Sequence, residues 1–166
     1  MDQLFTDLVA ILRQEIEQYR QLLALVRRER GYIVRGELTQ LAKVVQKKGT
    51  VSEGLYHLAA RRTSLLEQLA ESMGEPVDKL TLARVTRIAP GRTGETLSAL
   101  LGEFRELVGR LVTANEINRT LLERSLEFVR GSLNLFRTVA SPGPIYGANG
   151  RIESSSPMLA GLNQTA

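Results

Sequence analysis

The feature that most constrains this chain is an unbroken heptad pattern over residues 95–140. Steps of three and four residues meet only apolar or small polar side chains there: Leu97, Leu100, Phe104, Leu107, Leu111, Ala114, Asn118, Leu121, Ser125, Phe128, Ser132, Leu135 and Val139. That spacing is typical of a helix that packs along its length against other helices. We therefore predict a helix over residues 95–140, roughly 70 Å long at ~1.5 Å per residue, in an elongated molecule.

A second apolar row runs beside the first along the same stretch. It consists of Leu101, Val108, Asn115, Leu122, Val129 and Phe136. Two adjacent rows make the apolar surface wider than a two-stranded coiled coil requires, so this helix should contact more than one neighbour. Its six acidic and six basic residues cancel. We expect its partners to be recognised through shape and apolar surface rather than through net charge.

Two further helices are predicted ahead of this one, over residues 2–33 and 37–73, because apolar residues recur there at helical spacing. Gly36 follows the first periodic run, where glycine is a common stop signal. The connection is short, so the second helix should fold back antiparallel to the first. The fold class is therefore all-α, with residues 1–140 forming a single domain, an elongated antiparallel three-helix bundle or coiled coil.

Three segments should depart from regular helix. Gly49 and Gly54 each cost ~0.5–1 kcal/mol relative to alanine, which predicts a kink, fraying or a short gap between them. Residues 74–94 form a linker that contains a short helix capped by Asp78 or Thr81. Residues 141–166 are rich in Pro, Gly, Ser and Asn, so we expect a flexible tail that is disordered when free.

Length and composition agree with this picture. A chain of 166 residues is about one domain, and its hydrophobic content of 43% includes only 5% aromatic residues, as in many helix bundles. The absence of cysteine excludes a disulfide framework. The first residues lack the basic start of a signal peptide, and no apolar run is long enough to span a membrane. We expect a cytoplasmic protein.

No catalytic, cofactor-binding or metal-binding constellation is recognisable. His57 is the only histidine, and Glu53, one turn away, is its only nearby candidate partner, so a packed or surface histidine is the favoured interpretation. The sequence from Pro90 to Glu95 superficially suggests a phosphate-binding loop, but Glu95 stands where the loop needs lysine. We therefore expect no small-molecule substrate, no cofactor and no enzymatic activity.

Charge leaves a second function class open. The chain carries a formal net charge of +4, and its one basic concentration comprises Arg27, Arg28, Arg30, Arg35, Lys43, Lys47 and Lys48. Such a patch is usually a solvated helix face, and it could otherwise dock an acidic partner. The alternative function is a structural or nucleic-acid-associated coiled-coil protein that uses this patch. The patch lacks a docking motif and stacking aromatic residues, which disfavours nucleic acid.

Four polar residues lie on the apolar rows of the long helix: Asn115, Asn118, Ser125 and Ser132. A buried asparagine in a heptad pattern can specify one register, because slippage would leave its amide without a partner. Alternatively, this half of the helix forms a groove that its own chain leaves open for another helix. The sequence leaves both explanations open, and the wide apolar face equally allows a monomer or a homodimer.

The same stretch carries a resemblance to a known family. The pattern N-x-x-N-x-x-L-L-x-x-S-L over residues 115–126, followed by Tyr146-Gly147 and Gly150, resembles the FlgN-type flagellar export chaperones. The resemblance covers roughly residues 1–150. It implies a cytoplasmic chaperone that binds the helical C-terminal segment of flagellar hook-filament junction proteins before type III export, and that can engage the export gate.

The resemblance and the apolar rows together define a predicted partner-binding site. Its residues are Asn115, Asn118, Leu121, Leu122, Ser125, Leu126, Val129, Leu133 and Phe136, with Tyr146 as a second docking element. Within the long helix, residues 97–112 are expected to pack against the earlier helices. Function is expected in residues 115–136.

Overall fold

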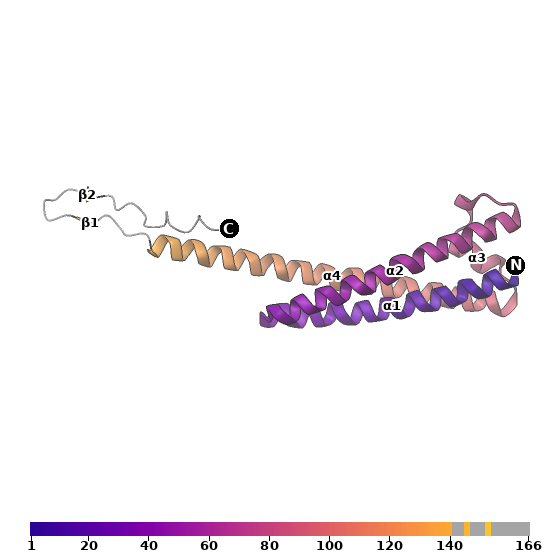
Figure 1. The fold of residues 1–166 in the computed structure, drawn as a ribbon, viewed down its shortest axis with the longest axis horizontal. Helices are drawn as coiled ribbons and strands as arrows, with labels where there is room; N and C mark the ends of the chain where they lie inside the picture. The colour runs from indigo at the N-terminus through magenta and orange to yellow at the C-terminus, as the bar shows by residue number, and fades with distance from the viewer. Residues whose placement is uncertain (141–144, 147–151, 154–166) are drawn as a thin grey trace, which may run out of the picture. The chain divides into compact units, whose positions relative to one another are not determined.

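The computed structural model describes residues 1–140, with side chains through Thr138, and the backbone of two short strands. Its elements are α1 (Asp2–Arg35), α2 (Leu38–Met73), the 3-10 helix η1 (Val77–Lys79), α3 (Leu82–Ile88), α4 (Gly91–Ala140), β1 (Ile145–Tyr146) and β2 (Ile152–Glu153) (Figure 1). The two strands pair antiparallel. The all-α class and the three long helices of residues 1–140 are confirmed. The short strands were not predicted, and disorder of the remaining tail stays a prediction because those residues lie outside the described part.

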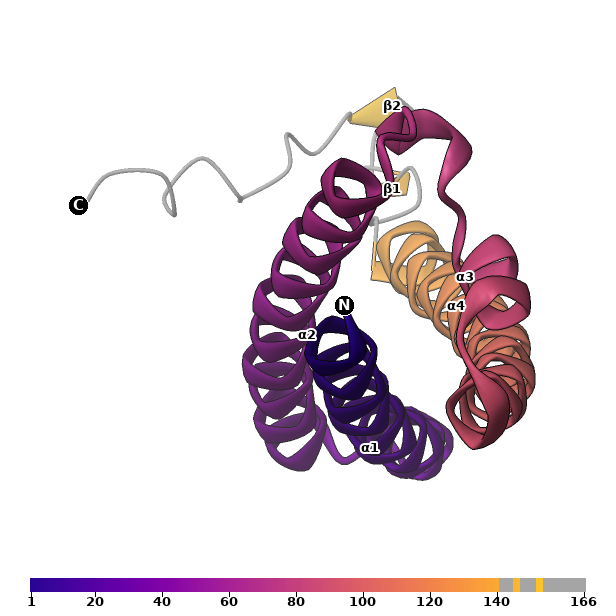
Figure 2. The ribbon, with the colours of Figure 1, turned by 90° about the vertical axis from the view of Figure 1, so that its right-hand side faces the viewer.

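The chain divides into two compact units, Met1–Leu122 and Glu123–Ala166. The division falls within α4, so this helix contributes residues to both units. Figure 2 views α1, α2 and the first part of α4 nearly end on, with α3 beside α4. The domain boundary that we expected at residue 140 stays a prediction.

The turn between α1 and α2 follows from glycine at position 36. Gly36 has φ 68°, a left-handed conformation that glycine adopts without the steric cost of a Cβ atom. Its N–H donates to the carbonyl of Ile33 at 3.2 Å, and the N–H of Glu37 donates to Tyr32 at 3.0 Å, which satisfies two carbonyls at the helix end. The predicted stop of the first helix is confirmed, with α1 continuing to Arg35.

The fraying or gap expected near Gly49 and Gly54 is not present, because α2 is helical from Leu38 to Met73. The alternative of a kink stays a prediction. Tertiary contacts outweigh the low helix propensity of glycine in this region. Leu55 is buried in a core cluster, and Val51 packs against the same cluster. The prediction of a gap was therefore wrong.

The linker contains the predicted short helix, and it shows which residue caps it. The side chain of Thr81 accepts a hydrogen bond from the backbone N–H of Arg84 at 3.2 Å, so Thr81 rather than Asp78 is the cap of α3. After α3, α4 begins at Gly91, four residues earlier than predicted. At Gly94 a Cβ atom would lie 2.7 Å from the carbonyl oxygen of Ala89. Glycine therefore permits the start of α4 to approach the end of α3.

Two clusters of buried side chains hold the first unit together. One joins α1, α2, α3 and α4 through residues that include Leu8, Leu69, Val85 and Leu97. The other lies further along the helices and contains Ile16, Val26, Leu55, Leu107 and Leu111. Each such side chain contributes roughly 1.5–3 kcal/mol when it is removed from water. The predicted packing of the first part of α4 against the earlier helices is confirmed.

A charged side chain is buried between the clusters. Glu15 on α1 is 1% exposed, and its two carboxylate oxygens lie 3.1 and 3.0 Å from Nε of Arg62 on α2. The guanidinium of Arg62 in turn lies 5.9 Å from the ring centroid of Phe104 on α4. Burial raises the pKa of Glu15 above its ordinary value, and the attraction of Arg62 offsets only part of this effect.

Candidate functional site

A buried polar layer joins the three long helices where the covered part of α4 ends. Asn118 on α4 is 3% exposed, and its Nδ2 donates to the carbonyl of Val26 at 2.8 Å and to Oε2 of Glu29 at 2.9 Å. The same Oε2 lies 2.7 Å from Nζ of Lys48 on α2. Nε of Arg30 donates to Oδ1 of Asn118 at 3.2 Å. The layer therefore contains residues from α1, α2 and α4.

This layer corrects one predicted partner contact. Both donors and the oxygen of the Asn118 amide already have partners within the first unit, so Asn118 does not face an open groove. A register shift of α4 by one heptad position would separate the amide from Glu29 and leave a buried carboxylate with one partner fewer. The contacts of Asn118 therefore support the first of the two explanations from the sequence, in which a buried asparagine specifies the register of the helix.

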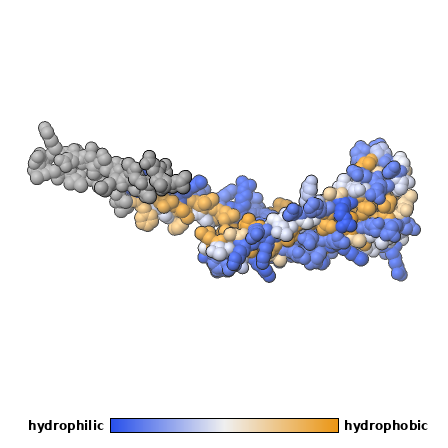
Figure 3. Space-filling view, in the orientation of Figure 1, coloured by the Kyte–Doolittle hydropathy of each residue, from blue (hydrophilic) through white to orange (hydrophobic). Residues whose placement is uncertain are grey.

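Beyond Asn118 the apolar rows of α4 become solvent-exposed. Phe128 is 76% exposed and Leu135 is 65% exposed, although the same heptad position is buried at Leu107 and Ala114. The exposed large apolar residues of this stretch are Leu122, Leu126, Phe128, Val129, Leu133, Leu135 and Phe136, which we call the α4 apolar face (Figure 3). A contiguous exposed apolar surface of this kind is a mark of an interaction site.

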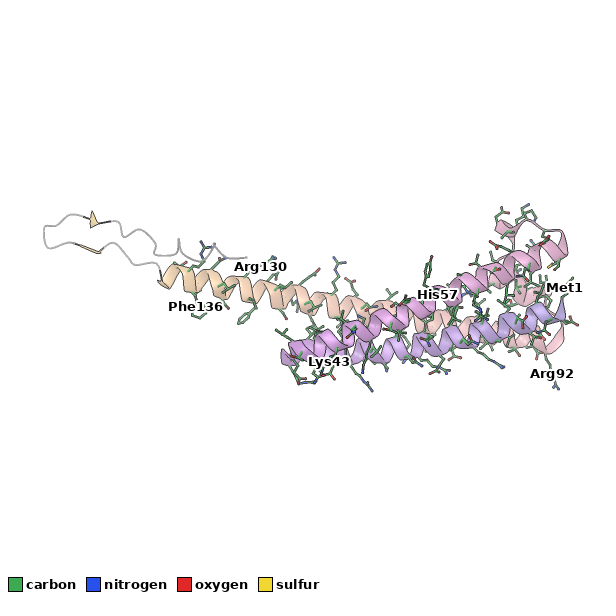
Figure 4. All side chains as sticks on the ribbon, in the orientation of Figure 1. Met1, Lys43, His57, Arg92, Arg130 and Phe136 are labelled. Carbon is green, nitrogen blue, oxygen red and sulfur yellow. The ribbon has the colours of Figure 1, made fainter. Side chains whose placement is uncertain are left out.

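The α4 apolar face is half a helix wide. At roughly 100° per residue, the Leu, Phe, Val and Ser positions from 121 to 136 cover about half the circumference. The opposite half carries polar residues such as Glu127, Arg130 and Asn134. Figure 4 shows Phe136 and Arg130 projecting from different sides of α4. The helix therefore presents one apolar side that matches a second amphipathic helix.

The remaining predicted site residues occupy several environments. Asn115 and Ser125 are exposed on α4, and Leu121 is half-buried. The backbone of Tyr146 pairs with Ile152 in the two-stranded sheet, but its side chain lies outside the described residues. The role of Tyr146 as a docking element therefore stays a prediction.

The predicted site omitted Phe128 and Leu135, two of the most exposed apolar residues of α4. Both lie on the first apolar row, which is buried in the first unit at Leu97, Leu107, Leu111 and Ala114. The heptad pattern marks them as apolar contacts, but the pattern alone does not show whether the chain itself supplies the partner. The solvent exposure of Phe128 and Leu135 in the structure shows that the described part of the chain does not cover them.

The basic patch on α1 and α2 is partly used for intramolecular contacts. Lys48 pairs with Glu29, Arg30 bonds to Asn118, and Arg35 pairs with Glu37 while it stacks on Tyr32. Fewer cations of this patch are therefore available to a polyanion than the sequence implies. This finding weakens the nucleic-acid alternative.

The described residues show little that resembles a chemical site. His57 is exposed on α2, with its ring 5.9 Å from that of Tyr56. Within the described residues, no three His, Cys, Asp or Glu side chains come together as metal ligands would. Nor does any described helix combine the length and hydropathy needed to cross a membrane.

Comparison with known proteins identifies a family but no individual relative. Searches of curated proteins and of solved structures gave no significant match. The family model described as FlgN protein matches residues 1–154, which include all of the described helices. FlgN proteins are flagellar export chaperones rather than enzymes. The match covers most of the 166 residues, so the chain belongs to the FlgN family of flagellar export chaperones.

Proposed function

We propose that this protein is a cytoplasmic chaperone that binds the helical C-terminal segment of flagellar hook-filament junction proteins and keeps them unassembled until type III export. The observation that carries this proposal is the α4 apolar face, which is exposed in a protein that belongs to a chaperone family. The face has the width and spacing that an amphipathic helix requires of its partner.

The α4 apolar face has enough apolar surface for useful affinity. Complete transfer of a Leu, Val or Phe side chain out of water contributes roughly 1.5–3 kcal/mol, and seven such side chains are partly or largely exposed here. Association costs at least several kcal/mol in lost freedom of motion. A micromolar complex needs about 8 kcal/mol, which lies within reach of this surface.

Holding cargo on this face requires no covalent chemistry. An apolar helix of a junction protein would be covered by the α4 apolar face and would be prevented from associating with other copies. Release then requires only a competing site with higher affinity for the cargo or for the chaperone, and we propose the export gate as that site. Asn115, Leu121 and Ser125 border the face and are proposed as additional contacts, with Tyr146 as a second docking element.

The proposal is tested by placing charges on the face. A double variant with Leu122→Asp and Val129→Asp should lose at least about a hundredfold in affinity for a junction-protein C-terminal peptide, because two carboxylates would be buried without partners. The affinity is measured by isothermal titration calorimetry with the full-length protein. Circular dichroism of the variant should match that of the wild type, since Val129 is exposed and Leu122 is partly exposed.

The matched control carries Arg130→Asp and Asn134→Asp. These residues are exposed and lie roughly 100° and 140° around the helix from Val129, so the control introduces the same groups on the polar side. We expect the control to bind the peptide within about threefold of the wild type. Unchanged binding by the Leu122 and Val129 variant, or equal losses in both variants, would contradict the proposal.

A further inference from the structure

A second candidate interface lies within the first unit, between α1 and α4. Two adjoining cavities of about 480 and 260 Å³ line this boundary. They share Leu23, Arg27, Glu106 and Arg110, so they form one continuous depression. We call it the α1–α4 groove.

The α1–α4 groove concentrates positive charge. Its lining includes five arginines and two glutamates, so it holds a net charge of +3 in a chain whose total is +4. The two glutamates are already paired, Glu103 with Arg20 and Glu106 with Arg110. The remaining three arginines therefore determine the charge that the groove presents.

Those three arginines have no acidic partner among the described residues. Within the described residues Arg30 donates to two neutral acceptors, Oδ1 of Asn118 and the carbonyl of Ala114. Arg27 and Arg105 are exposed, and no ion pair is formed by either within the described part of the chain. Three guanidinium groups along one groove favour a ligand with several carboxylates, which arginine binds in a two-pronged geometry.

The base of the groove is apolar. Leu23 and Ala114 are buried there, and Ile117 is 41% exposed. At Gly109 an added Cβ atom would meet no heavy atom within 4 Å, so the glycine leaves open space beside these apolar groups. An apolar base flanked by cations is complementary to an amphipathic helix whose apolar side is flanked by acidic residues.

We propose that the α1–α4 groove binds an acidic amphipathic helix of a second protein, independently of the segment held by the α4 apolar face. Among the described residues no aromatic side chain lines the groove, so its described lining lacks the stacking surface that single-stranded nucleic acids use. This chain's own tail is a poor occupant, because Glu153 is its only acidic side chain after residue 140.

The probe is a designed peptide of about 18 residues, or five helical turns, with Leu at heptad spacing and Glu beside each Leu. Its twin replaces every Glu by Gln. We expect full-length protein at low salt to bind the acidic peptide at least about tenfold more tightly than the twin, by fluorescence anisotropy. Moderate salt should reduce this difference, since exposed charges are screened.

Two variants locate the binding. Arg27→Glu with Arg105→Glu changes the net charge of the groove from +3 to −1 and should weaken binding of the acidic peptide about tenfold. Gly109→Leu fills the open space without changing the charge of the groove, and it should weaken the binding of both peptides. Gly102→Leu is the matched control, because Gly102 is exposed on α4, outside the groove, and an added Cβ atom there also meets nothing within 4 Å.

Several results would overturn the inference. Equal affinities of the two peptides, or wild-type affinity in Gly109→Leu, would remove the groove as the site. Displacement of the peptide by a uridine-rich RNA at lower concentrations than unlabelled peptide would assign the surface to nucleic acid. The variant with Leu122→Asp and Val129→Asp should bind the acidic peptide as the wild type does. If this variant loses binding of the acidic peptide, the two sites are not independent, and this holds whether or not the variant still binds the junction-protein peptide.

Discussion

The two parts of α4 carry the same heptad pattern but meet different surroundings. Before Asn118 most of its apolar positions are buried or half-buried, with Leu97 only 1% exposed and Leu107 and Leu111 in a core cluster with α1 and α2. After Leu122 the same rows are exposed, as at Phe128 and Leu135. Burial in the first part stabilises the protein, whereas exposure in the second part costs solvation free energy that a partner can recover.

The comparison shows what a heptad pattern means physically. The pattern states that a helix has an apolar side, and it does not state which chain covers that side. In this protein the change occurs at Asn118, where a polar layer ends the packing of α4 against α1 and α2. A single helix therefore serves as scaffold in one part and as candidate binding surface in the other.

Loss of a core side chain is the largest expected effect that tests this difference between the two parts of α4. Leu97→Ala should destabilise the protein by about 3 kcal/mol, because it removes buried apolar atoms and leaves a cavity. Leu133→Ala removes the same atoms from a residue that is 57% exposed, and should change stability by less than about 0.5 kcal/mol. Urea unfolding followed by circular dichroism measures both, and equal losses would show that the two parts of α4 are covered alike.

A somewhat smaller effect tests whether the polar layer at Asn118 marks the end of the buried part of α4. Asn118→Asp would place a carboxylate about where the amide lies 2.9 Å from Oε2 of Glu29, and should cost roughly 2–3 kcal/mol at neutral pH. Asn115→Asp, at an exposed position, should leave the urea midpoint nearly unchanged. A neutral result at Asn118 would mean that the polar layer does not fix α4.

The smallest expected effect is the pH dependence of stability that buried Glu15 causes in the first unit. The pKa of Glu15 is raised in the folded protein, so between the unfolded and folded pKa values the folded state binds more protons. Stability contributed by Glu15 is therefore lost as pH rises through this range. When the pH is lowered from 7.5 toward 5, the wild type should gain stability relative to Glu15→Gln. Urea unfolding of both proteins at both pH values measures this difference. A gain in the opposite direction would show that the charge of Arg62 outweighs burial.

The sequence predicts the helices well because apolar spacing and glycine stop signals are local. The end of α1 near Gly36 illustrates this, whereas for the cap of α3 the sequence left both Asp78 and Thr81 open. It fails where tertiary contacts decide. Gly49 and Gly54 remain helical because Val51 and Leu55 pack against a core cluster.

The candidate site shows the same limit. Asn118 could be recognised as an unusual polar residue, but its burial depends on Val26, Glu29 and Arg30, which are distant in sequence. Likewise, the equal numbers of acidic and basic residues over positions 95–140 conceal that Arg105 has no acidic partner among the described residues while Arg110 pairs with Glu106. Pairing is a property of three-dimensional structure, and counting charges does not reveal it.

The central claim, that the exposed part of α4 binds cargo, is tested most directly by thiol labelling. The chain contains no cysteine, so Leu133→Cys and Asn134→Cys each create a unique thiol on one side of the helix. With saturating junction-protein C-terminal peptide, maleimide labelling should slow at least about tenfold for Leu133→Cys, because its thiol becomes buried. Labelling of Asn134→Cys should keep its rate. An unchanged rate at Leu133→Cys in the presence of bound peptide would contradict the account.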